Sequence, residues 1–439
     1  MAGISGRWCK INTLFPTTYQ RVSDAAGRYA GTLRNFNLDV RLYLVTSALF
    51  GFTIFGGIYF TLLNLYLLRL GYDPQFAGLI NGVGQVIFGL CALPAGALGR
   101  RWGSRRMLII GFGVVAVGYA LLPLAEFVPS IQTGWLVVMQ AVGQIGVSIY
   151  FVNGAPFVMT VTQPTERNHA FAMSGALLPL TGFAGSLVGG LLPGFFAGLS
   201  GASAANPAPY RYSLLLAAGL MALAVVAMLF TRSPAAAPPA ATETKEKVPA
   251  PVGIFVWLFL VVLLRVIGEG DVRTFFNIYL DDFLQVPVAQ IGLLLAVGQL
   301  LAVPAAMVMP IFAKRWGIKA TYLIGSWGMA LSFLPLALVP HWAAAGAGFM
   351  SMITLLSIAR PAVVAYQMDI SPPGWRTIMA GATSTAVGLG WGIASLSGGY
   401  IATRYGYSAL FLSAAAVTAA ASLVFWLVRP PVREQPDSF

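Results

Sequence analysis

The chain has 439 residues, of which 58% are apolar and only 9% are charged, and its mean hydropathy is +0.78. This composition excludes an ordinary water-soluble domain and is typical of a polytopic helical membrane protein. The formal net charge of +12 does not indicate nucleic-acid binding, because the basic residues lie in short loops between apolar runs, where they orient membrane proteins.

Residues 1–40 are basic and carry apolar side chains at helical spacing. This pattern predicts a cytosolic segment with an amphipathic helix lying on the inner membrane surface. An organellar transit peptide has a similar arginine-containing, acid-poor composition and is the alternative. Cys9 and Cys91 fall in this tail and in an apolar run, so we expect no disulfide between them.

Twelve apolar segments follow, each long enough to cross a bilayer. They are residues 41–67, 74–98, 106–125, 132–159, 168–192, 210–230, 252–280, 287–312, 318–339, 342–367, 377–402 and 406–429. With both termini in the cytosol, the inner loops and tails hold 20 Lys and Arg residues, whereas the outer loops hold only Arg69, Arg211 and Arg404. The positive-inside rule therefore predicts a multi-pass protein of the inner (plasma) membrane in this orientation.

Two halves of six spans each are separated by residues 231–251, a proline- and charge-rich stretch that predicts a flexible cytosolic linker. The halves repeat each other at an offset of 214 residues, most clearly where Arg101-Trp-Gly103 recurs as Arg315-Trp-Gly317. We expect an all-α membrane protein with two pseudo-symmetric six-helix bundles, residues 41–230 and 252–429, and a cytosolic tail at 430–439. A parallel repeat of this kind predicts a binding site between the halves.

Four charges interrupt the apolar run that begins at Val252: Arg265, Glu269, Asp271 and Arg273. A charge at the centre of a membrane helix costs about 3 kcal/mol on insertion scales, so it needs a partner or a wet cavity. On a helix the two arginines and the glutamate fall within an arc of about 80° and can form a ladder with Glu269 shared. Asp271 points to nearly the opposite side unless the flanking glycines let the helix unwind. A static ion-pair staple between helices is the alternative to a functional site.

Between the second and third spans the chain reads Gly96-Ala-Leu-Gly-Arg100-Arg101-Trp-Gly103-Ser-Arg105-Arg106. This loop, together with the two six-span halves and the linker, resembles the major facilitator superfamily over residues 41–429. The resemblance implies a gating loop, with the acidic position of the family signature replaced by Arg100. Its residues are Gly96, Arg100, Arg101, Gly103 and Arg105, with Lys314, Arg315 and Gly317 in the second half. Anchoring by the positive-inside rule is the alternative role for these arginines.

In that superfamily spans 1, 4, 7 and 10 line a central cavity, so the resemblance brings Arg360 of span ten towards Arg265 and Glu269. An arginine pair suits a carboxylate or phosphate group through bidentate hydrogen bonds. Amides in the same four spans can bind cargo or bond helix to helix. The predicted substrate-binding residues are Arg265, Arg273, Asn277, Arg360, Gln140, Gln144, Asn153 and Asn64.

Our leading hypothesis is a secondary active transporter of a small organic solute, with Glu269 or Asp271 carrying a coupling proton. The alternatives are a lipid or lysolipid flippase, a multidrug efflux protein, and a transporter-like solute sensor. No catalytic triad, phosphate loop or zinc spacing occurs, so we expect no enzyme, cofactor or metal site. The expected partners are the small-molecule substrate, a proton and the lipid bilayer, and we expect a monomer.

Overall fold

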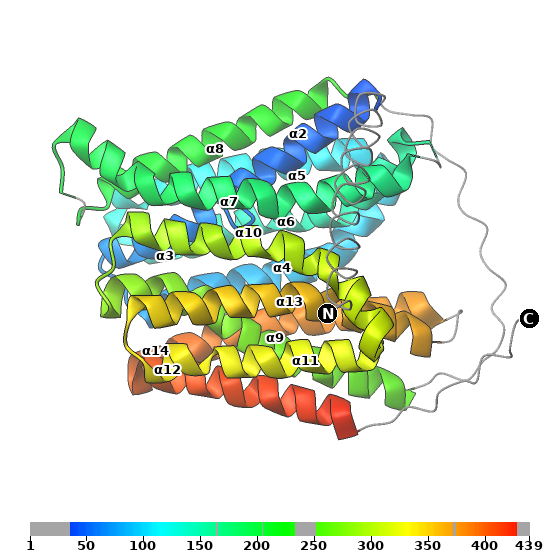
Figure 1. The fold of residues 1–439 in the computed structure, drawn as a ribbon. Coiled ribbons are helices and arrows are strands. Elements are labelled where there is room, and N and C mark those ends of the chain that lie inside the picture. The colour runs from blue at the N-terminus through cyan, green and yellow to red at the C-terminus, as the bar shows by residue number, and fades with distance from the viewer. Residues whose placement is uncertain (1–35, 164–165, 204, 233–251, 372–374, 428–439) are drawn as a thin grey trace, which may run out of the picture.

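The computed structural model describes residues 36–163, 166–203, 205–232, 252–371 and 375–427. All regular elements within these ranges are helices (Figure 1). The predicted amphipathic helix before residue 36, most of the linker and the tail after residue 427 lie outside the described residues. Cys9 also lies outside the described residues, so the expectation that Cys9 and Cys91 form no disulfide falls outside the structure as well.

The described part of the first half forms seven α-helices. They are α2 (Leu38–Thr53), α3 (Ile58–Arg69), α4 (Pro74–Trp102), α5 (Ser104–Leu121), α6 (Gln132–Val161), α7 (Arg167–Ser200) and α8 (Ala208–Leu229), with the 3-10 helices η1 (Leu122–Phe127) and η2 (Pro129–Ile131) before α6. The second half forms α9 (Val252–Ile278), the π-helix η3 (Tyr279–Phe283), α10 (Val288–Trp316), α11 (Ile318–Ser332), α12 (Leu334–Leu338), α13 (Trp342–Ile370) and α14 (Arg376–Leu427).

Within the described residues, eleven helical stretches are long and apolar enough to cross a membrane. The last of them, Ile378–Leu427, bends at Gly406, whose φ of 85° and ψ of 169° are not helical. Because the chain reverses there, α14 supplies two crossings, and the described chain crosses the bundle twelve times. The last two predicted spans, 377–402 and 406–429, therefore form one helical stretch that bends at Gly406.

The first span is not continuous, contrary to the prediction of a single helix over 41–67. It breaks between Thr53 and Ile58, where Gly56 has a φ of 80° that side chains disfavour. The Ser186 hydroxyl of α7 donates a hydrogen bond to the Gly56 carbonyl, and the Gln299 side chain of α10 packs where a Cβ atom of Gly56 would lie. A hydroxyl group of another helix is therefore the hydrogen-bond partner of the Gly56 carbonyl group at membrane depth.

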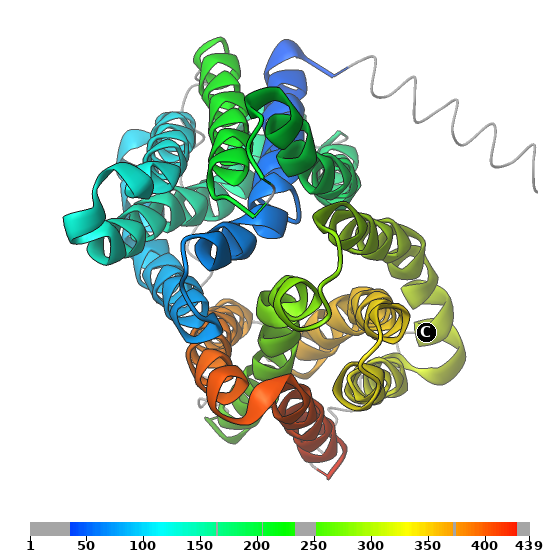
Figure 2. The ribbon, with the colours of Figure 1, turned by 90° about the vertical axis from the view of Figure 1, so that its left-hand side faces the viewer.

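The two halves lie side by side, and Figure 2 views one end of the bundle, which we call the distal face. The distal face carries the turn at Gly71 and the bend at Gly406. The opposite end, which we call the linker face, carries the turns at Gly103 and Gly317 and the chain ends next to the linker. Across the halves, α4 packs on α14 and α7 packs on α10.

Glycines allow these two contacts between the halves to be close. A Cβ atom at Gly190 of α7 would lie 2.9 Å from the Gly292 Cα of α10. One at Gly78 of α4 would clash with the Ser395 carbonyl of α14. Small residues let membrane helices approach until their backbones touch, because lipid tails supply no hydrophobic force between helices. The halves thus meet through backbone surfaces on both flanks of the central helices α3 and α9.

Candidate central site

The charged ladder predicted for the seventh span is present on α9. Arg265 Nη1 donates to Glu269 Oε2 at 2.8 Å, and Arg273 Nη1 donates to Glu269 Oε1 at 3.5 Å. The three side chains are 4%, 5% and 11% exposed for Arg265, Glu269 and Arg273. One buried carboxylate is therefore shared between two guanidinium groups, as the i, i+4 spacing predicts.

The helix does not unwind at the glycines on either side of Glu269. α9 is continuous from Val252 to Ile278, because Gly268 and Gly270 serve packing against α14. A Cβ atom at Gly268 would clash with the Thr418 hydroxyl and lie 2.7 Å from the Ala414 carbonyl oxygen. At Gly270 it would lie 2.7 Å from the Ala394 Cβ. Of the two cases left open by the sequence, the structure therefore has the regular helix, with Asp271 turned away from the ladder.

Asp271 lies on a different face of α9 from the ladder. It is 3% exposed, and its Oδ1 has no hydrogen-bond partner among the described residues. That oxygen would be 2.5 Å from a Cβ atom at Gly398 of α14, next to Phe275. Asp271 makes no salt bridge within the described chain. It is thus a second buried carboxyl group in the same helix, without the cationic partners that Glu269 has.

Arg273 lies where the two halves meet. Its guanidinium carbon is 5.5 Å from the centre of the Phe60 ring of α3 and 5.7 Å from that of the Trp391 ring of α14. Aromatic faces attract a guanidinium group through their negative quadrupole. Arg360 of α13 lies close enough to Glu269 and Arg273 to interact with their charges, and its side chain is exposed. The structure therefore brings Arg265 and Arg273 together on one glutamate, with Arg360 of the neighbouring helix within electrostatic range.

Three predicted amides of α6 lie against α4. Gln140 and Gln144 both pack over Gly84, whose Cβ position is 3.1 Å from Gln140 Nε2 and 3.0 Å from Gln144 Cγ. Gln140 Oε1 is buried without a hydrogen-bond partner in the described chain. Asn153 donates to the carbonyl oxygens of Ala95 and Ile149 at 3.3 and 3.0 Å. Asn153 therefore bonds helix to helix within the first half.

Asn64 of α3 and Asn277 of α9 form a reciprocal pair between the halves, which we call the asparagine clasp. Asn64 Nδ2 donates to the Thr274 carbonyl oxygen at 2.8 Å, and Asn277 Nδ2 donates to the Thr61 carbonyl oxygen at 3.1 Å. Asn64 Nδ2 also lies 3.3 Å from Asn277 Oδ1. Asn81 Nδ2 of α4 donates to Asn64 Oδ1 at 2.8 Å and holds its orientation.

The reciprocity follows from a repeat that our sequence analysis missed. Thr61-Leu-Leu-Asn64-Leu-Tyr66-Leu67 recurs as Thr274-Phe-Phe-Asn277-Ile-Tyr279-Leu280, and the two asparagines are 213 residues apart. Each asparagine bonds the carbonyl group three positions before its own counterpart. A shared Thr-x-x-Asn-x-Tyr-Leu pattern could have revealed this repeat. It was missed because its offset is 213 residues, one less than the offset of 214 found elsewhere.

One further ion pair joins the halves near the distal face. Arg69, at the end of α3, donates to both carboxylate oxygens of Asp281 in η3, at 2.8 and 2.7 Å. The side chains are 22% and 6% exposed. Bidentate geometry makes this the stronger form of an arginine–carboxylate pair. Together with the asparagine clasp it closes α3 onto α9.

The predicted gating-loop residues lie at the linker face, away from the charged ladder. Gly103 and Gly317 have φ angles of 88° and 82°, so both turns need glycine for the same reason. Arg105 donates to the Thr231 hydroxyl and the Leu229 carbonyl at the end of α8. Gly96 lies one helical turn before Arg100 and Arg101, which are exposed in the last turn of α4, as Lys314 and Arg315 are in α10.

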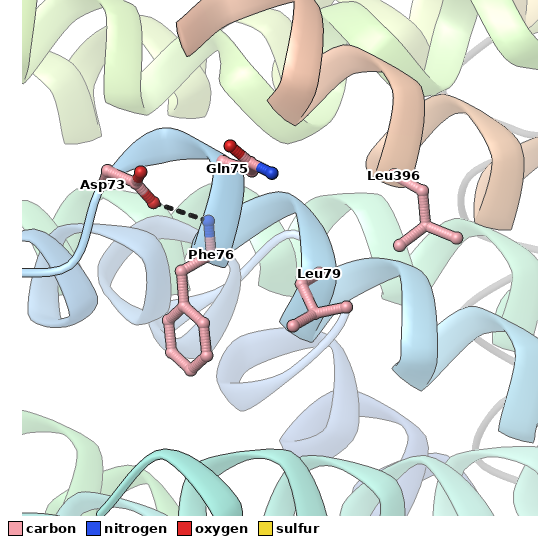
Figure 3. Close-up of a pocket in the computed structure, with 5 residues that line it drawn as sticks. All are labelled: Asp73, Gln75, Phe76, Leu79 and Leu396. Carbon is pink, nitrogen blue, oxygen red and sulfur yellow. Dashed lines mark hydrogen bonds between the residues drawn. The ribbon is translucent and has the colours of Figure 1, made fainter.

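Two surface depressions lie outside the charged cluster. One lies between Pro310, Ile311, Lys314 and Arg315 on α10. The other, drawn in Figure 3, is formed by the start of α4 and Leu396 of α14. Its carboxylate, Asp73, accepts a hydrogen bond from the Phe76 backbone N–H at 2.8 Å and caps α4 (Figure 3). The depression in Figure 3 contains none of the predicted site residues.

Comparison with known proteins agrees with this architecture. The sequence model of the Major Facilitator Superfamily matches residues 44–268 and 258–439. An uncharacterised MFS-type transporter of Mycobacterium tuberculosis (strain ATCC 25618 / H37Rv) is 27% identical over 383 residues, which span 81% of this chain and 84% of that protein.

Solved structures of low sequence identity share the fold. The inward open conformation of the xylose transporter XylE from E. coli covers 91% of this chain and 96% of its own, with a TM-score of 0.69 at 14% identity. The nucleoside transporter NupG covers 89% and 98%, with a TM-score of 0.65 at 14% identity. The predicted fold class and the family resemblance are confirmed: this chain belongs to the Major Facilitator Superfamily and is a multi-pass membrane transporter.

Proposed function

We propose that this protein is a proton-coupled secondary active transporter that moves a small organic solute through the site around Glu269. The observation that carries the proposal is a buried ladder of three ionisable groups, Arg265, Glu269 and Arg273, at membrane depth where the two halves meet. Such groups are costly inside a bilayer and mark substrate and ion pathways. Transport proceeds by rocking of residues 41–230 against residues 252–429 around this midplane site.

The polar contacts between α3 and α9 support an alternating-access cycle. The asparagine clasp between α3 and α9 and the Arg69–Asp281 pair between α3 and η3 lie between the charged ladder and the distal face. The basic turns at Gly103 and Gly317 favour a cytosolic linker face, with both termini in the cytosol of a cell bounded by the plasma membrane. In that orientation the protein is closed to the outside, and opening requires these contacts to break.

Glu269 is the proposed coupling group, and Asp271 is the second candidate. Loss of a proton from Glu269 creates the charge that Arg265 and Arg273 bind, so partner exchange during the cycle can drive proton uptake and release. Asp271 can hold a proton without breaking an ion pair, because it has no cationic partner in the described chain. The two carboxyl groups therefore predict different consequences of substitution.

Proteoliposomes loaded with a pH-sensitive dye test the proposal. The wild-type protein and the Glu269→Gln, Asp271→Asn and Glu126→Gln variants are each exposed to a panel of sugars, nucleosides, amino acids, organic anions and cationic drugs. Glu126→Gln is the matched control, because it removes a carboxylate that pairs with Arg211 outside the cluster. We expect at least one solute to move protons with wild type and Glu126→Gln, but not with Glu269→Gln.

Two outcomes contradict the proposal. Coupled proton movement that survives in Glu269→Gln but disappears in Asp271→Asn transfers the coupling role to Asp271. Solute counterflow without any proton movement in wild type refutes coupling and leaves a uniporter. Gel filtration and thermal unfolding of each variant show that lost transport does not reflect lost folding.

A further inference from the structure

The central cluster carries more positive than negative charge. Arg265 and Arg273 both contact the single carboxylate of Glu269, and Arg360 lies within electrostatic range of it, so three positive charges face one negative charge. Asp271 does not supply a further counter-charge, because it lies on the α14 side of α9 and makes no ion pair among the described residues. Uncompensated charge at this depth needs water or an anion.

Several donors of these arginines also have no acceptor. The Nε groups of Arg265 and Arg273 are buried and lack a hydrogen-bond partner in the described chain. Arg360 makes no ion pair within the described residues, although its side chain is exposed beside Glu269 and Arg273. A guanidinium group has five N–H donors in a planar fork, and it cannot release its proton to relieve the deficit. The cluster therefore lacks both negative charge and acceptor atoms.

Aromatic rings border the charged cluster on the side of Arg273. Phe60 belongs to the first half and Trp391 to the second, and both rings lie within 6 Å of the guanidinium carbon. An anion held by Arg273 would have apolar surface next to it on both sides. This combination suits an organic anion with an apolar body better than a bare inorganic ion.

We infer that the cargo of this transporter is an organic anion whose carboxylate or phosphate group binds Arg273 and Arg360. This inference rests on the proposed transport function and names the class of substrate for the same site. Two guanidinium forks from α9 and α13 supply bidentate hydrogen bonds, and Glu269 becomes the counter-charge that the cargo replaces on Arg273. Lipid headgroups and soluble metabolites both offer this chemistry, and the experiment separates them.

Calorimetric titration of the full chain in nanodiscs measures binding of acetate, inorganic phosphate, benzoate and phenyl phosphate, with benzamide as the neutral isostere. We expect benzoate and phenyl phosphate to bind at least about tenfold more tightly than benzamide, the difference that one charge-assisted hydrogen-bonded contact supplies. Benzoate should also bind more tightly than acetate because of the aromatic rings. Equal binding of benzoate and benzamide, or no binding of any of the four anions, overturns the inference.

Substitutions at Arg360 locate the binding to this cluster. Arg360→Gln should weaken benzoate binding about tenfold or more. Arg360→Lys keeps the positive charge but cannot form two parallel hydrogen bonds, so its benzoate affinity should lie between those of wild type and Arg360→Gln. Arg404→Gln is the control, since it removes an exposed arginine from the distal end of α14 and should leave the affinity unchanged. Unchanged benzoate affinity in Arg360→Gln overturns the assignment to this site.

Competition with a lysophosphatidate tests whether the bound anion is a lipid headgroup or a soluble metabolite. Counterflow of labelled benzoate across sealed proteoliposomes tests whether the bound anion is transported. Displacement of benzoate by lysophosphatidate at lower concentration than by phenyl phosphate supports the same chemistry on a lipid. Arg360-dependent binding without counterflow supports an organic-anion site at this cluster, but it refutes the proposed transport and with it the role of the anion as cargo. Counterflow of a neutral solute by a protein that binds no anion refutes the inference and leaves transport intact.

Discussion

The asparagine clasp should hold the distal face closed, and its removal should open that face. Asn64→Ala removes a 2.8 Å hydrogen bond to the opposite half, and Asn277→Ala removes one of 3.1 Å. Each such bond contributes about 0.5–1.5 kcal/mol, and bonds between membrane helices average about 0.6 kcal/mol. Each single variant should therefore raise the ratio of open to closed protein by about threefold to tenfold.

The double variant tests the reciprocity of the clasp. Each asparagine keeps its own bond to the opposite backbone when the other is replaced, so most of the two effects should add. Only the 3.3 Å contact between Asn64 Nδ2 and Asn277 Oδ1 is lost in both single variants. We therefore expect a coupling energy of about 0.5 kcal/mol, near the lower end for residues in one network.

Spin labels on the distal face measure this opening. Ser130→Cys in η2 and Ala343→Cys in α13 place labels on exposed positions in the two halves, after Cys9 and Cys91 are replaced by serine. Pulsed electron–electron double resonance then gives the distribution of distances between the two labels, with short distances for the closed distal face and long distances for the open one. Asn153→Ala is the matched control, because its hydrogen bonds stay within the first half.

An unchanged distance distribution in both single variants would refute the reasoning, provided that the labelled parent shows both populations. Opening by Asn153→Ala to the same extent would also refute it, since loss of any buried amide would then have the same effect. Opening by Asn64→Ala alone would mean that the two halves contribute unequally despite the matching sequence pattern.

Three further predictions concern helix contacts. Gly268→Ala should lower the thermal midpoint, at a cost of about 1–3 kcal/mol for overpacking against α14, whereas Gly253→Ala on the same helix should not, because its Cβ position has nothing within 4 Å. Gly78→Ala should separate α4 from α14 and lengthen the distal label distance; an unchanged distance would contradict the close backbone contact described for it. Arg69→Gln and Asp281→Asn should each open the distal face, and their double variant should open it less than the two effects sum to, by a coupling of about 0.5–3 kcal/mol.

Much of the fold was predictable because membrane spans are long apolar runs with polar or glycine-rich ends. The predicted starts at residues 74, 132, 252, 318 and 342 agree with the structure. The shared position of Glu269 between two arginines was also predictable, since it depends only on the spacing along one helix.

Features that depend on contacts between helices were not predictable in the same way. The break before Ile58 lies in an apolar run, where a hydroxyl group of α7 bonds the Gly56 carbonyl and a side chain of α10 packs against Gly56, which no local pattern reveals. Likewise, the roles of Asn64 and Asn277 depend on the register of α3 against α9. Sequence reasoning placed both asparagines among cavity residues, whereas in this conformation each bonds the backbone of the opposite half.

The asparagine clasp also shows how two similar halves can carry either the same or different residues at matching positions. In a symmetric dimer of identical halves, a residue near the two-fold axis meets its own copy, so it must be self-complementary. An amide meets that condition because it both donates and accepts, as Asn64 and Asn277 do. An arginine side chain only donates, so it is not self-complementary. Arg273 nevertheless lies against Phe60, which occupies the matching position of the repeat in the other half. A homodimer cannot hold unlike residues at such a position, whereas a chain with two different halves can, so the charged cluster depends on the asymmetry between the halves.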